Sequence, residues 1–228
     1  DGATGAAMIH SLAMKIGSRR QKQLAVWGAL VVAIGAATSR DGGETFTKVG
    51  PGPILGRSLH EPFVISGPKI RRFGNAWFLF YIAGTRWKPV DGRPEPVYKI
   101  RMAISTDGHN WQRINRNLIA NRLEEDEAQA SPDVFYLNGW YHMFFCYRHT
   151  FDFRTNPERG YRIGHAWSHD LSNWTRDDAM APLHVPAGDW DSDMQCYPNV
   201  FECDGRVYML YNGNQFGREG FGLAVLEP

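Results

Sequence analysis

The sequence has almost no excess of charge of either sign. Its 228 residues include 25 lysines and arginines against 24 aspartates and glutamates, for a formal net charge of +1. A chain with so little net charge creates no global field that attracts nucleic acid or an anionic membrane. We therefore expect neither nucleic acid nor a membrane among its partners.

Cysteine is scarce as well. The three cysteines, Cys146, Cys196 and Cys203, lack Cys-x-x-Cys spacing, and their odd number argues against a disulfide framework. Cys146 lies in the apolar run HMFFCY, which predicts a buried, inert thiol. No cluster of the zinc-binding type is visible, and we expect no cofactor.

No apolar run is long enough to suggest a membrane span. The run Leu24–Ala37 has about 14 residues, whereas a spanning helix needs roughly 20. With the basic residues before it, Met14–Ala37 resembles a signal peptide, which would place the protein outside the cell. The alternative, which we favour, is a short helix over AAMIHSLAMKI and a buried strand over ALVVAIGAATS. The compartment stays open between secreted and cytoplasmic.

Aromatic residues, glycine and proline are abundant. The chain holds 8 Trp, 9 Tyr and 13 Phe together with 24 Gly and 13 Pro. This composition fits a fold rich in strands and turns better than a helical bundle.

A short turn motif occurs three times. SRDGGETF begins at Ser39, STDGHNW at Ser105 and SHDLSNW at Ser168, about 66 and 63 residues apart. The aspartate of each motif is suited to accept hydrogen bonds from backbone N–H groups of its own turn. The aromatic residue that follows, Phe46, Trp111 or Trp174, is expected to pack between sheets. The motif is therefore predicted to be structural rather than catalytic.

The segments before these turns repeat with the same period. SGPKIRRFGNAWFLFYIAG, ASPDVFYLNGWYHMFFCYR and CYPNVFECDGRVYMLYNGN each contain a proline, an apolar strand, a glycine turn and an aromatic-rich strand. A third strand follows, as in YKIRMAIS, YRIGHAWS and FGLAVLEP, and a short edge strand begins at the aromatic residue of the turn motif. Four antiparallel strands in about 65 residues are typical of a β-propeller blade.

The repeat predicts an all-β fold, a β-propeller of four-stranded antiparallel blades over residues 31–228, after an atypical and partly helical segment over residues 1–30. Only about three and a half units are visible, whereas propellers typically close with about four to eight blades. The propeller is therefore expected to be N-terminally incomplete. Closure would need a degenerate N-terminal blade, further sequence, or a partner chain, and a homo-oligomer would supply such a partner.

The direction of the strands predicts where a site lies. In a blade, the loop that leads into the first strand, here called the approach loop, lies on the same face as the loop between the second and third strands. Acidic residues recur at matching positions of the approach loops, and one more starts an inner strand. These residues are Glu61, Glu125, Glu127, Asp191, Asp193 and Asp133. Because equivalent positions converge in a radial array, we expect these carboxylates to face one cavity, where crowding would raise their pKa values.

The loops on this face add complementary polar and aromatic groups. These groups belong to His60, Arg86, Trp87, Arg148, His149 and Asn214. Carboxylates, amides, arginines and an aromatic ring around one pocket suit a sugar, because its hydroxyls take polar contacts and its C–H face stacks on an aromatic ring.

Four segments, SPDVFYLNGWYHMFF, YPNVFECDGRVYMLY, STDGHNW and SHDLSNW, resemble the inner-strand and blade-closing segments of five-bladed β-propeller glycosidases over roughly residues 34–228. The glycosidases that they resemble belong to glycoside hydrolase families 43 and 32 and, more distantly, family 130. The resemblance implies five blades and three acidic residues on inner strands, one of them from the first blade. The Asp-Pro start of a normal first blade is missing, as are Glu-Gly-Pro and Glu-Cys-Pro, so the catalytic residues do not transfer one by one.

The sequence predicts a glycoside hydrolase that acts with paired carboxylates on a glycoside or oligosaccharide. We expect Glu61, Glu127 and Asp191 to be the catalytic acids, and the other site residues to bind the sugar. A carboxyl separation of about 5–5.5 Å would indicate a retaining enzyme and about 6.5–9.5 Å an inverting one. Phosphate as acceptor stays open, because Lys88, Arg148 and His149 could bind it.

Two other classes of function stay open. One is a non-catalytic propeller that binds carbohydrate or protein, for which sugar binding would survive replacement of the carboxylates. The other is a six-bladed sialidase, since SRDGGETF fits its Ser-x-Asp-x-Gly-x-Thr-aromatic turn, although the period of about 65 residues favours five blades. A structural calcium or sodium ion in the central channel would be compatible with any of these.

Overall fold

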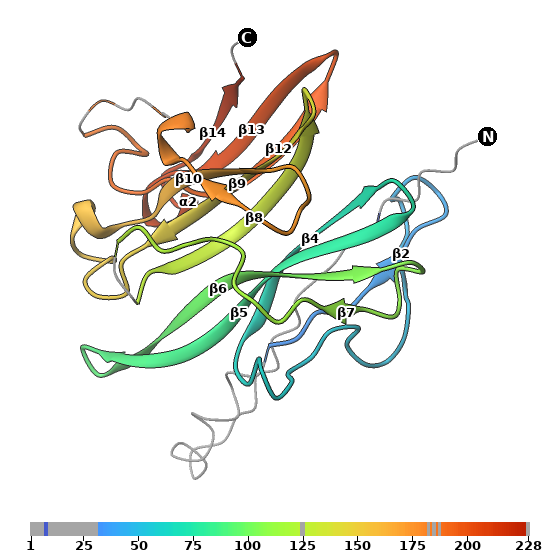
Figure 1. Ribbon diagram of the computed structural model, residues 1–228. Helices are drawn as coiled ribbons and strands as arrows, with labels where there is room; N and C mark the ends of the chain where they lie inside the picture. The colour runs from blue at the N-terminus through green and yellow to red at the C-terminus, as the bar shows by residue number, and fades with distance from the viewer. Residues whose placement is uncertain are drawn as a thin grey trace.

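The structure is a computed structural model that describes residues 7–8, 32–123, 126–181, 183, 186 and 188–226. Over these residues the chain forms four antiparallel sheets, each built from strands in chain order (Figure 1). The first holds β1 (Ala7–Met8), β2 (Ala37–Thr38) and β3 (Thr47–Lys48). The second holds β4 (Ile65–Phe73), β5 (Ala76–Val90), β6 (Arg93–Ser105) and β7 (Gln112–Arg113).

The third sheet holds β8 (Ala128–Leu137), β9 (Trp140–Arg148), β10 (Arg162–Ser168) and β11 (Thr175–Arg176). The fourth holds β12 (Cys196–Cys203), β13 (Arg206–Asn212) and β14 (Phe221–Val225). Two 3-10 turns, Pro157–Arg159 and Asp178–Met180, and the single turn α2 (Asn214–Gly217) complete the described secondary structure. The predicted four-stranded blades are confirmed in the second and third sheets.

Tight turns set the register of the hairpins. Asn138–Gly139 and Asp204–Gly205 join the first two strands of the third and fourth sheets, and all four residues have positive φ angles of 51°, 88°, 50° and 72°. Two consecutive residues with positive φ make the type I′ turn, whose twist matches that of the flanking strands. Asn-Gly and Asp-Gly are the pairs that best tolerate this turn, which explains why they occur between the paired strands.

Each inner strand carries a bulge next to its repeat proline. The residue before that proline has a left-handed backbone, with φ of 58° at Gly67, 49° at Ser131 and 58° at Tyr197, and the pairing with the second strand shifts there. Proline has no N–H to give to the ladder, so a bulge accommodates it at little cost. The bulge also re-aims the next side chain, and in β8 that side chain is Asp133.

The Ser-x-Asp turns have the predicted structural role. Asp107 Oδ1 accepts hydrogen bonds from the backbone N–H groups of His109 and Asn110, both at 2.8 Å. These bonds hold the pKa of Asp107 well below its usual value. The bonds at Asp170 are equivalent, from the N–H groups of Ser172 and Asn173 at 2.8 and 2.7 Å.

The aromatic residues after these turns differ in burial. Trp111 and Trp174 pack against the two buried clusters, as predicted. Phe46 is 39% exposed, so the prediction that it packs between sheets is wrong. It lies just before β3, the edge strand of a small sheet of short strands that leaves it uncovered.

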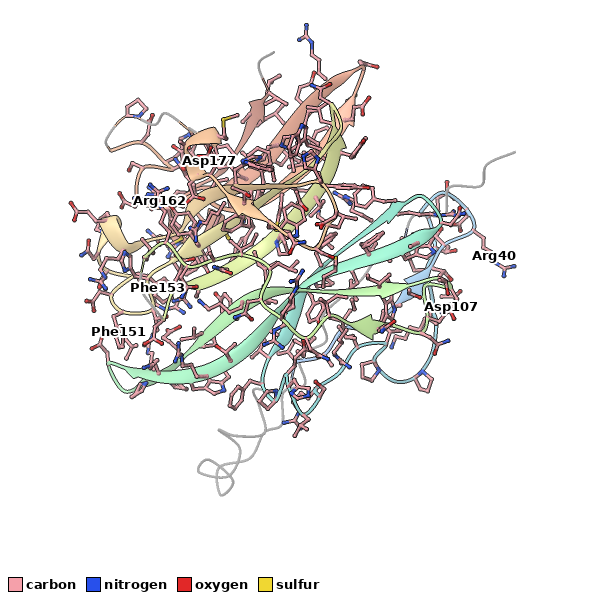
Figure 2. All side chains as sticks on the ribbon, viewed as in Figure 1. Arg40, Asp107, Phe151, Phe153, Arg162 and Asp177 are labelled. Atoms are coloured by element: carbon pink, nitrogen blue, oxygen red, sulfur yellow. The ribbon has the colours of Figure 1, made fainter. Side chains whose placement is uncertain are left out.

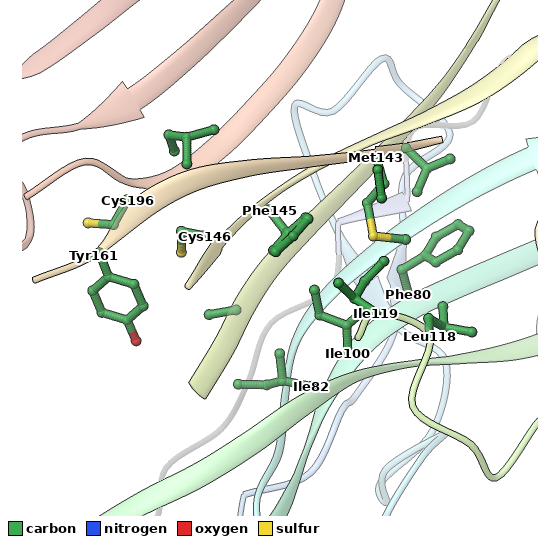
Figure 3. Close-up of a cluster of buried hydrophobic side chains, with 14 of the residues drawn as sticks. Phe80, Ile82, Ile100, Leu118, Ile119, Met143, Phe145, Cys146, Tyr161 and Cys196 are labelled. Atoms are coloured by element: carbon green, nitrogen blue, oxygen red, sulfur yellow. The ribbon is translucent and has the colours of Figure 1, made fainter. Parts of the chain in front are cut away.

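The main core extends through the second, third and fourth sheets (Figure 3). Phe80 and Ile100 of the second sheet face Met143 and Phe145 of β9, and all four are fully buried. Cys146 is also buried within this cluster, as the sequence predicts. Burial of such side chains contributes about 1.5–3 kcal/mol each and joins consecutive blades into one body.

The N-terminal predictions fall largely outside the described residues. The helix expected over AAMIHSLAMKI lies outside them except at Ala7–Met8, which is a strand, so the helix is corrected at these two residues. Most of the signal-like run Met14–Ala37 also lies outside the described residues, and the domain boundary stays a prediction. Ala7–Met8 pairs with β2, and Ile34 is buried and bridges Leu55. Among the residues that the structure describes, no helix has the length and hydropathy of a membrane span.

Candidate functional site

The approach loops and the loops between second and third strands lie on one face, as predicted. Asp126, in the approach loop of the third sheet, pairs through its two oxygens with Arg86 Nε and Lys88 Nζ of β5, each at 2.8 Å. The Thr150 hydroxyl, after β9, donates to the carbonyl of Asp126. Trp87 is half-buried and pairs with Pro96 across the long β5–β6 hairpin. Hairpin and approach loop thus form a continuous rim.

Glu61 lies buried against the second sheet. Its carboxylate accepts hydrogen bonds from the Tyr81 hydroxyl at 2.7 Å, Arg113 Nε at 2.8 Å and Arg101 Nη1 at 3.3 Å. Its exposed fraction is 0%. Burial, together with the bond to Glu61, raises the pKa of Tyr81 well above its usual range. Neighbouring His60 is exposed, and its carbonyl accepts a bond from Arg101.

Glu127 is held in the same way on the third sheet. It accepts hydrogen bonds from Arg176 Nη1 at 2.7 Å, from Gln129 Nε2 at 2.9 Å, and from two backbone N–H groups of its loop at 2.9 Å. Lys99 of β6 donates to the Glu127 carbonyl. Burial lowers the pKa of Lys99 to about 8, although the charge of Glu127 opposes this shift.

Asp191 lies against the fourth sheet. Its Oδ2 accepts a hydrogen bond from the Tyr211 hydroxyl at 2.7 Å, and its residue is 3% exposed. The adjacent Trp190 stacks on the Tyr211 ring with centroids 5.7 Å apart. Among the described residues, no ion pair reaches Asp191.

Each of the three expected acids is bound within its own blade. Glu61, Glu127 and Asp191 each contact their own sheet, and no hydrogen bond or salt bridge among the described residues joins any two of them. The expectation of a shared carboxylate cavity stays a prediction. The catalytic role of the three stays a prediction.

Asp133 joins the inner strands of three sheets. It pairs with Lys69 at 3.0 Å and with Arg71, both of β4, and accepts the N–H of Val200 of β12 at 2.7 Å. Burial raises its pKa, while the charges of Arg71 and Lys69 oppose the shift. Both oxygens are already bound to cations or an amide, so this carboxylate does not fit a channel calcium or sodium ion. No metal-binding group of three side chains occurs among the described residues.

Two adjoining cavities open on the face of the approach loops. They have volumes of about 310 and 460 Å³ and share Phe153, Arg154 and Phe216 in their walls. The first is also lined by Tyr98, Arg148, Tyr161 and Tyr197, and the second by Asp193, Asn214 and Glu219, among others. Figure 2 shows Phe153 on the loop after β9, beside the long β5–β6 hairpin.

Arginines and aromatic rings alternate in the first cavity. The guanidinium of Arg148, 2% exposed, lies 3.6 Å from the centroid of the Phe153 ring. Its Nε has no hydrogen-bond partner among the residues that the structure describes. Arg154 binds Glu95 through Nε and Nη2 at 3.0 and 3.3 Å, and lies 5.3 Å from the Phe216 ring. The hydroxyls of Tyr98 and Tyr161 bind each other.

The side-chain amide of Asn214 holds the wall of the second cavity together. Asn214 Oδ1 accepts the N–H groups of Asp193 and Met194 at 2.8 and 2.9 Å, while its Nδ2 donates to the Asp189 carbonyl at 3.0 Å. These bonds fix the approach loop against α2. The carboxylate of Asp193 is left on an exposed residue at the cavity wall.

The cavities bring together only part of the predicted set. Arg148, Asp193 and Asn214 line them, and His149 is adjacent through its carbonyl, which accepts Arg148 Nη1 at 2.9 Å. Glu125 lies outside the described residues. Six further residues of the cavity wall were not predicted from the sequence: Glu95, Tyr98, Phe153, Tyr161, Tyr197 and Phe216. Phe153 and Phe216 interrupt polar loops, and this signal could have identified them.

The comparisons with known proteins identify the fold. No family model matches the chain. Uncharacterized proteins from two strains of Mycobacterium tuberculosis are 34% identical over 194 residues, 85% of this chain and 61% of theirs. The chain thus spans about three fifths of the length of these curated relatives.

Several solved structures are similar in fold. A glycoside hydrolase superposes with a TM-score of 0.72 at 20% identity, over 100% of this chain and 64% of its own. A thermostable family-43 glycoside hydrolase has a TM-score of 0.62 at 15% identity, covering 87% of this chain and 64% of its own. The Bombyx mori GH32 beta-fructofuranosidase has a TM-score of 0.62 at 14% identity, covering 99% and 45%. The chain has the β-propeller fold of these glycoside hydrolases.

Proposed function

We propose that this chain forms the sugar-binding face of a carbohydrate-active enzyme, a glycoside hydrolase that acts on a glycoside or oligosaccharide. The observation that carries the proposal is the pair of adjoining cavities on the approach-loop face. Aromatic rings such as Phe216 offer flat apolar surfaces, and Arg154, Asn214 and Asp193 offer polar contacts around them. This combination suits a sugar ring and its hydroxyls.

The chemistry would follow the two-carboxylate scheme. One carboxylic acid protonates the leaving oxygen while a carboxylate activates water or attacks the anomeric carbon. Glu61, Glu127 and Asp191 stay our proposed acids, and to act they would have to exchange their present partners for substrate. Asp193 is the predicted carboxylate that already lies on a cavity wall.

A panel of chromogenic glycosides, with and without phosphate, tests the activity. We expect release from one sugar class, strongly reduced in Phe216→Ala and Arg154→Gln. Tyr136→Ala is the matched control, because Tyr136 is 55% exposed and lines a different cavity between β8 and β12. A dependence on phosphate would indicate a phosphorylase, with Arg148 and Arg154 as the nearest cations. Equal activity in all three variants would exclude these cavities as the site.

The role of the acids needs a separate measurement. Glu127→Gln and Glu61→Gln are compared with the parent chain for both turnover and Tm. If turnover is lost while Tm is unchanged, the carboxylates act in catalysis. If Tm falls far enough to explain the lost turnover, both carboxylates instead hold the loops in place.

A binding module is the second candidate function. It is favoured by the burial of Glu61 and Glu127, both 0% exposed and already paired with arginine. In that case none of the chromogenic glycosides is cleaved. Calorimetry with the same sugars then detects binding, which Phe216→Ala abolishes. Absence of both turnover and binding would overturn the carbohydrate proposal.

A further inference from the structure

The walls of the two adjoining cavities differ in charge. The wall of the first holds two cations, Arg148 and Arg154, against the single carboxylate of Glu95. The wall of the second holds as many carboxylates as cations: Arg154, Arg218, Asp193 and Glu219. One excess positive charge among the aromatic rings of the first wall favours an anionic group in the first cavity.

Arg154 offers one edge of its guanidinium to a ligand. Its Nε and Nη2 bind Glu95 at 3.0 and 3.3 Å, and its Nη1 makes no hydrogen bond within the part of the chain that the structure describes. The side chain of Arg154 is 48% exposed and lines both cavities. A guanidinium carries five N–H donors in a flat fork, so the edge formed by Nη1 and Nη2 matches the two oxygens of a second carboxylate.

The position of Arg154 is fixed by its neighbours before any ligand binds. Glu95, whose side chain is 9% exposed, holds the opposite edge of the guanidinium. The guanidinium carbon lies 4.5 Å from the centroid of the Phe153 ring and 5.3 Å from that of the Phe216 ring. Little rotamer freedom is therefore left to lose on binding, and a bidentate contact gains affinity from this preorganisation.

Arg148 adds a second positive charge to the same wall. It is 2% exposed, and its Nη2 lies 3.8 Å from Glu95 Oε2. Glu95 is thus shared by two arginines. One carboxylate does not neutralise two guanidinium charges, and a buried cation without a full counter-charge is costly. An anion bound beside Arg154 would lower that cost.

We infer that the ligand of these cavities is an acidic sugar, a uronate, whose carboxylate binds the free edge of Arg154 in the first cavity. The inference rests on the proposed function and names the substrate class of that same site. The hydroxyls of the ligand then face the second cavity, where the carboxylates of Asp193 and Glu219 are suited to accept their hydrogen bonds. A monoanion fits the single excess charge of the first cavity better than a phosphate, which carries about 1.5–2 negative charges at pH 7.

Calorimetry on the whole chain tests the inference by comparing each acid with its own ester. The probes are the methyl glycosides of galacturonic, glucuronic and mannuronic acid and their methyl esters, which keep the sugar ring and lose the charge. For one of the three sugars we expect the acid to bind at least about tenfold more tightly than the ester, the ratio expected of one charge-assisted hydrogen bond.

Substitutions locate this preference for the acid. Arg154→Gln should reduce it to about twofold or less, and Arg154→Lys should leave an intermediate preference, because lysine keeps the charge but not the fork. Arg122→Gln is the matched control. The side chain of Arg122 is 59% exposed and lines neither cavity, so this variant should keep the full preference.

The outcomes separate this inference from the proposed function. Equal binding of acid and ester, or a preference that survives in Arg154→Gln, would overturn the uronate and leave the binding of neutral sugars intact. Tighter binding of galactose 6-phosphate than of every uronate would also overturn it, in favour of a phosphorylated sugar. If no acid, ester or neutral methyl glycoside binds, the proposed function is wrong and the inference fails with it.

The parent chain decides if Arg154→Gln does not fold. Raising the concentration of NaCl from about 0.02 to about 0.5 M should reduce the preference for the acid at least about threefold, because salt screens an ion pair at a half-exposed arginine. A preference that does not change with salt would refute the pairing of the carboxylate with Arg154.

Discussion

His142 Nδ1 and His165 Nε2 lie 3.1 Å apart on adjacent strands of the third sheet and share a hydrogen bond. Such a bond needs one ring to accept, so at least one imidazole is neutral. Burial, and then the charge of His142, lowers the pKa of His165 to about 4, although Asp177 and Asp178 oppose the shift. Burial also lowers the pKa of His142. The pair therefore favours the neutral forms of both rings.

Because of this histidine pair, the free energy of unfolding depends on pH. The unfolded chain binds protons at its histidines near pH 6.5, whereas folded His165 does so only near pH 4. The stabilisation is therefore present above pH 6.5 and is lost as pH falls towards 4, by about 3 kcal/mol. Urea unfolding at a series of pH values measures it. His165→Phe should flatten the slope, and His109→Ala, in an exposed turn, should leave it unchanged. A slope that persists in His165→Phe would contradict this account.

The pair of Arg176 and Glu127 gives a second prediction. Arg176→Met leaves Glu127 buried without its cation, which should lower the free energy of unfolding by about 3–5 kcal/mol. The double variant with Glu127→Gln should recover part of that loss, because the stranded charge is gone. Denaturant titration measures both.

The control for this prediction is Arg122→Met. Arg122 pairs with Asp178 at 3.0 Å, but its side chain is 59% exposed, so the expected cost is about 0–1 kcal/mol. A cost for Arg176→Met no larger than that of the control would show that the ion pair does not fasten the loop.

The blades could be predicted from the sequence because their signals are local. A proline beside an inner-strand bulge, an Asn-Gly or Asp-Gly turn and a Ser-x-Asp turn each fix backbone geometry over a few residues. Their spacing of about 65 residues then orders the strands without any long-range information. The short edge strands β7 and β11 follow, because each begins one residue after the tryptophan of the turn.

The contacts of the acidic side chains could not be predicted from the sequence in the same way. Glu61 lies in the approach loop, as expected, but its carboxylate binds Arg113 on the outermost strand of the blade. That pairing joins positions far apart in the chain, and only the recurrence of arginine two residues after Trp111 and Trp174 hints at it. Periodicity alone does not tell a channel residue from one that anchors a loop.

A third prediction concerns the turn aspartates. Asp170→Ala removes the acceptor of the Ser172 and Asn173 N–H groups, and should lower Tm by a few degrees, since such local bonds resemble helix caps. Asp170→Asn keeps one acceptor oxygen and should lose less. Thermal unfolding by circular dichroism measures both, and an alanine variant as stable as the parent would refute the structural role of the turn.

The last prediction concerns self-association. Phe221, Leu223 and Val225 are 74%, 55% and 42% exposed and point to one face of β14. The equivalent residues of β6 include Ile100 and Met102, which are fully buried because the next sheet covers them. An uncovered apolar row favours association with another surface of its kind. We therefore expect light scattering to detect oligomers whose share rises with concentration. Leu223→Ser should reduce that share, whereas a polar change at exposed Tyr136, Tyr136→Ser, should not. A strictly monomeric parent chain at all concentrations would refute the homo-oligomer.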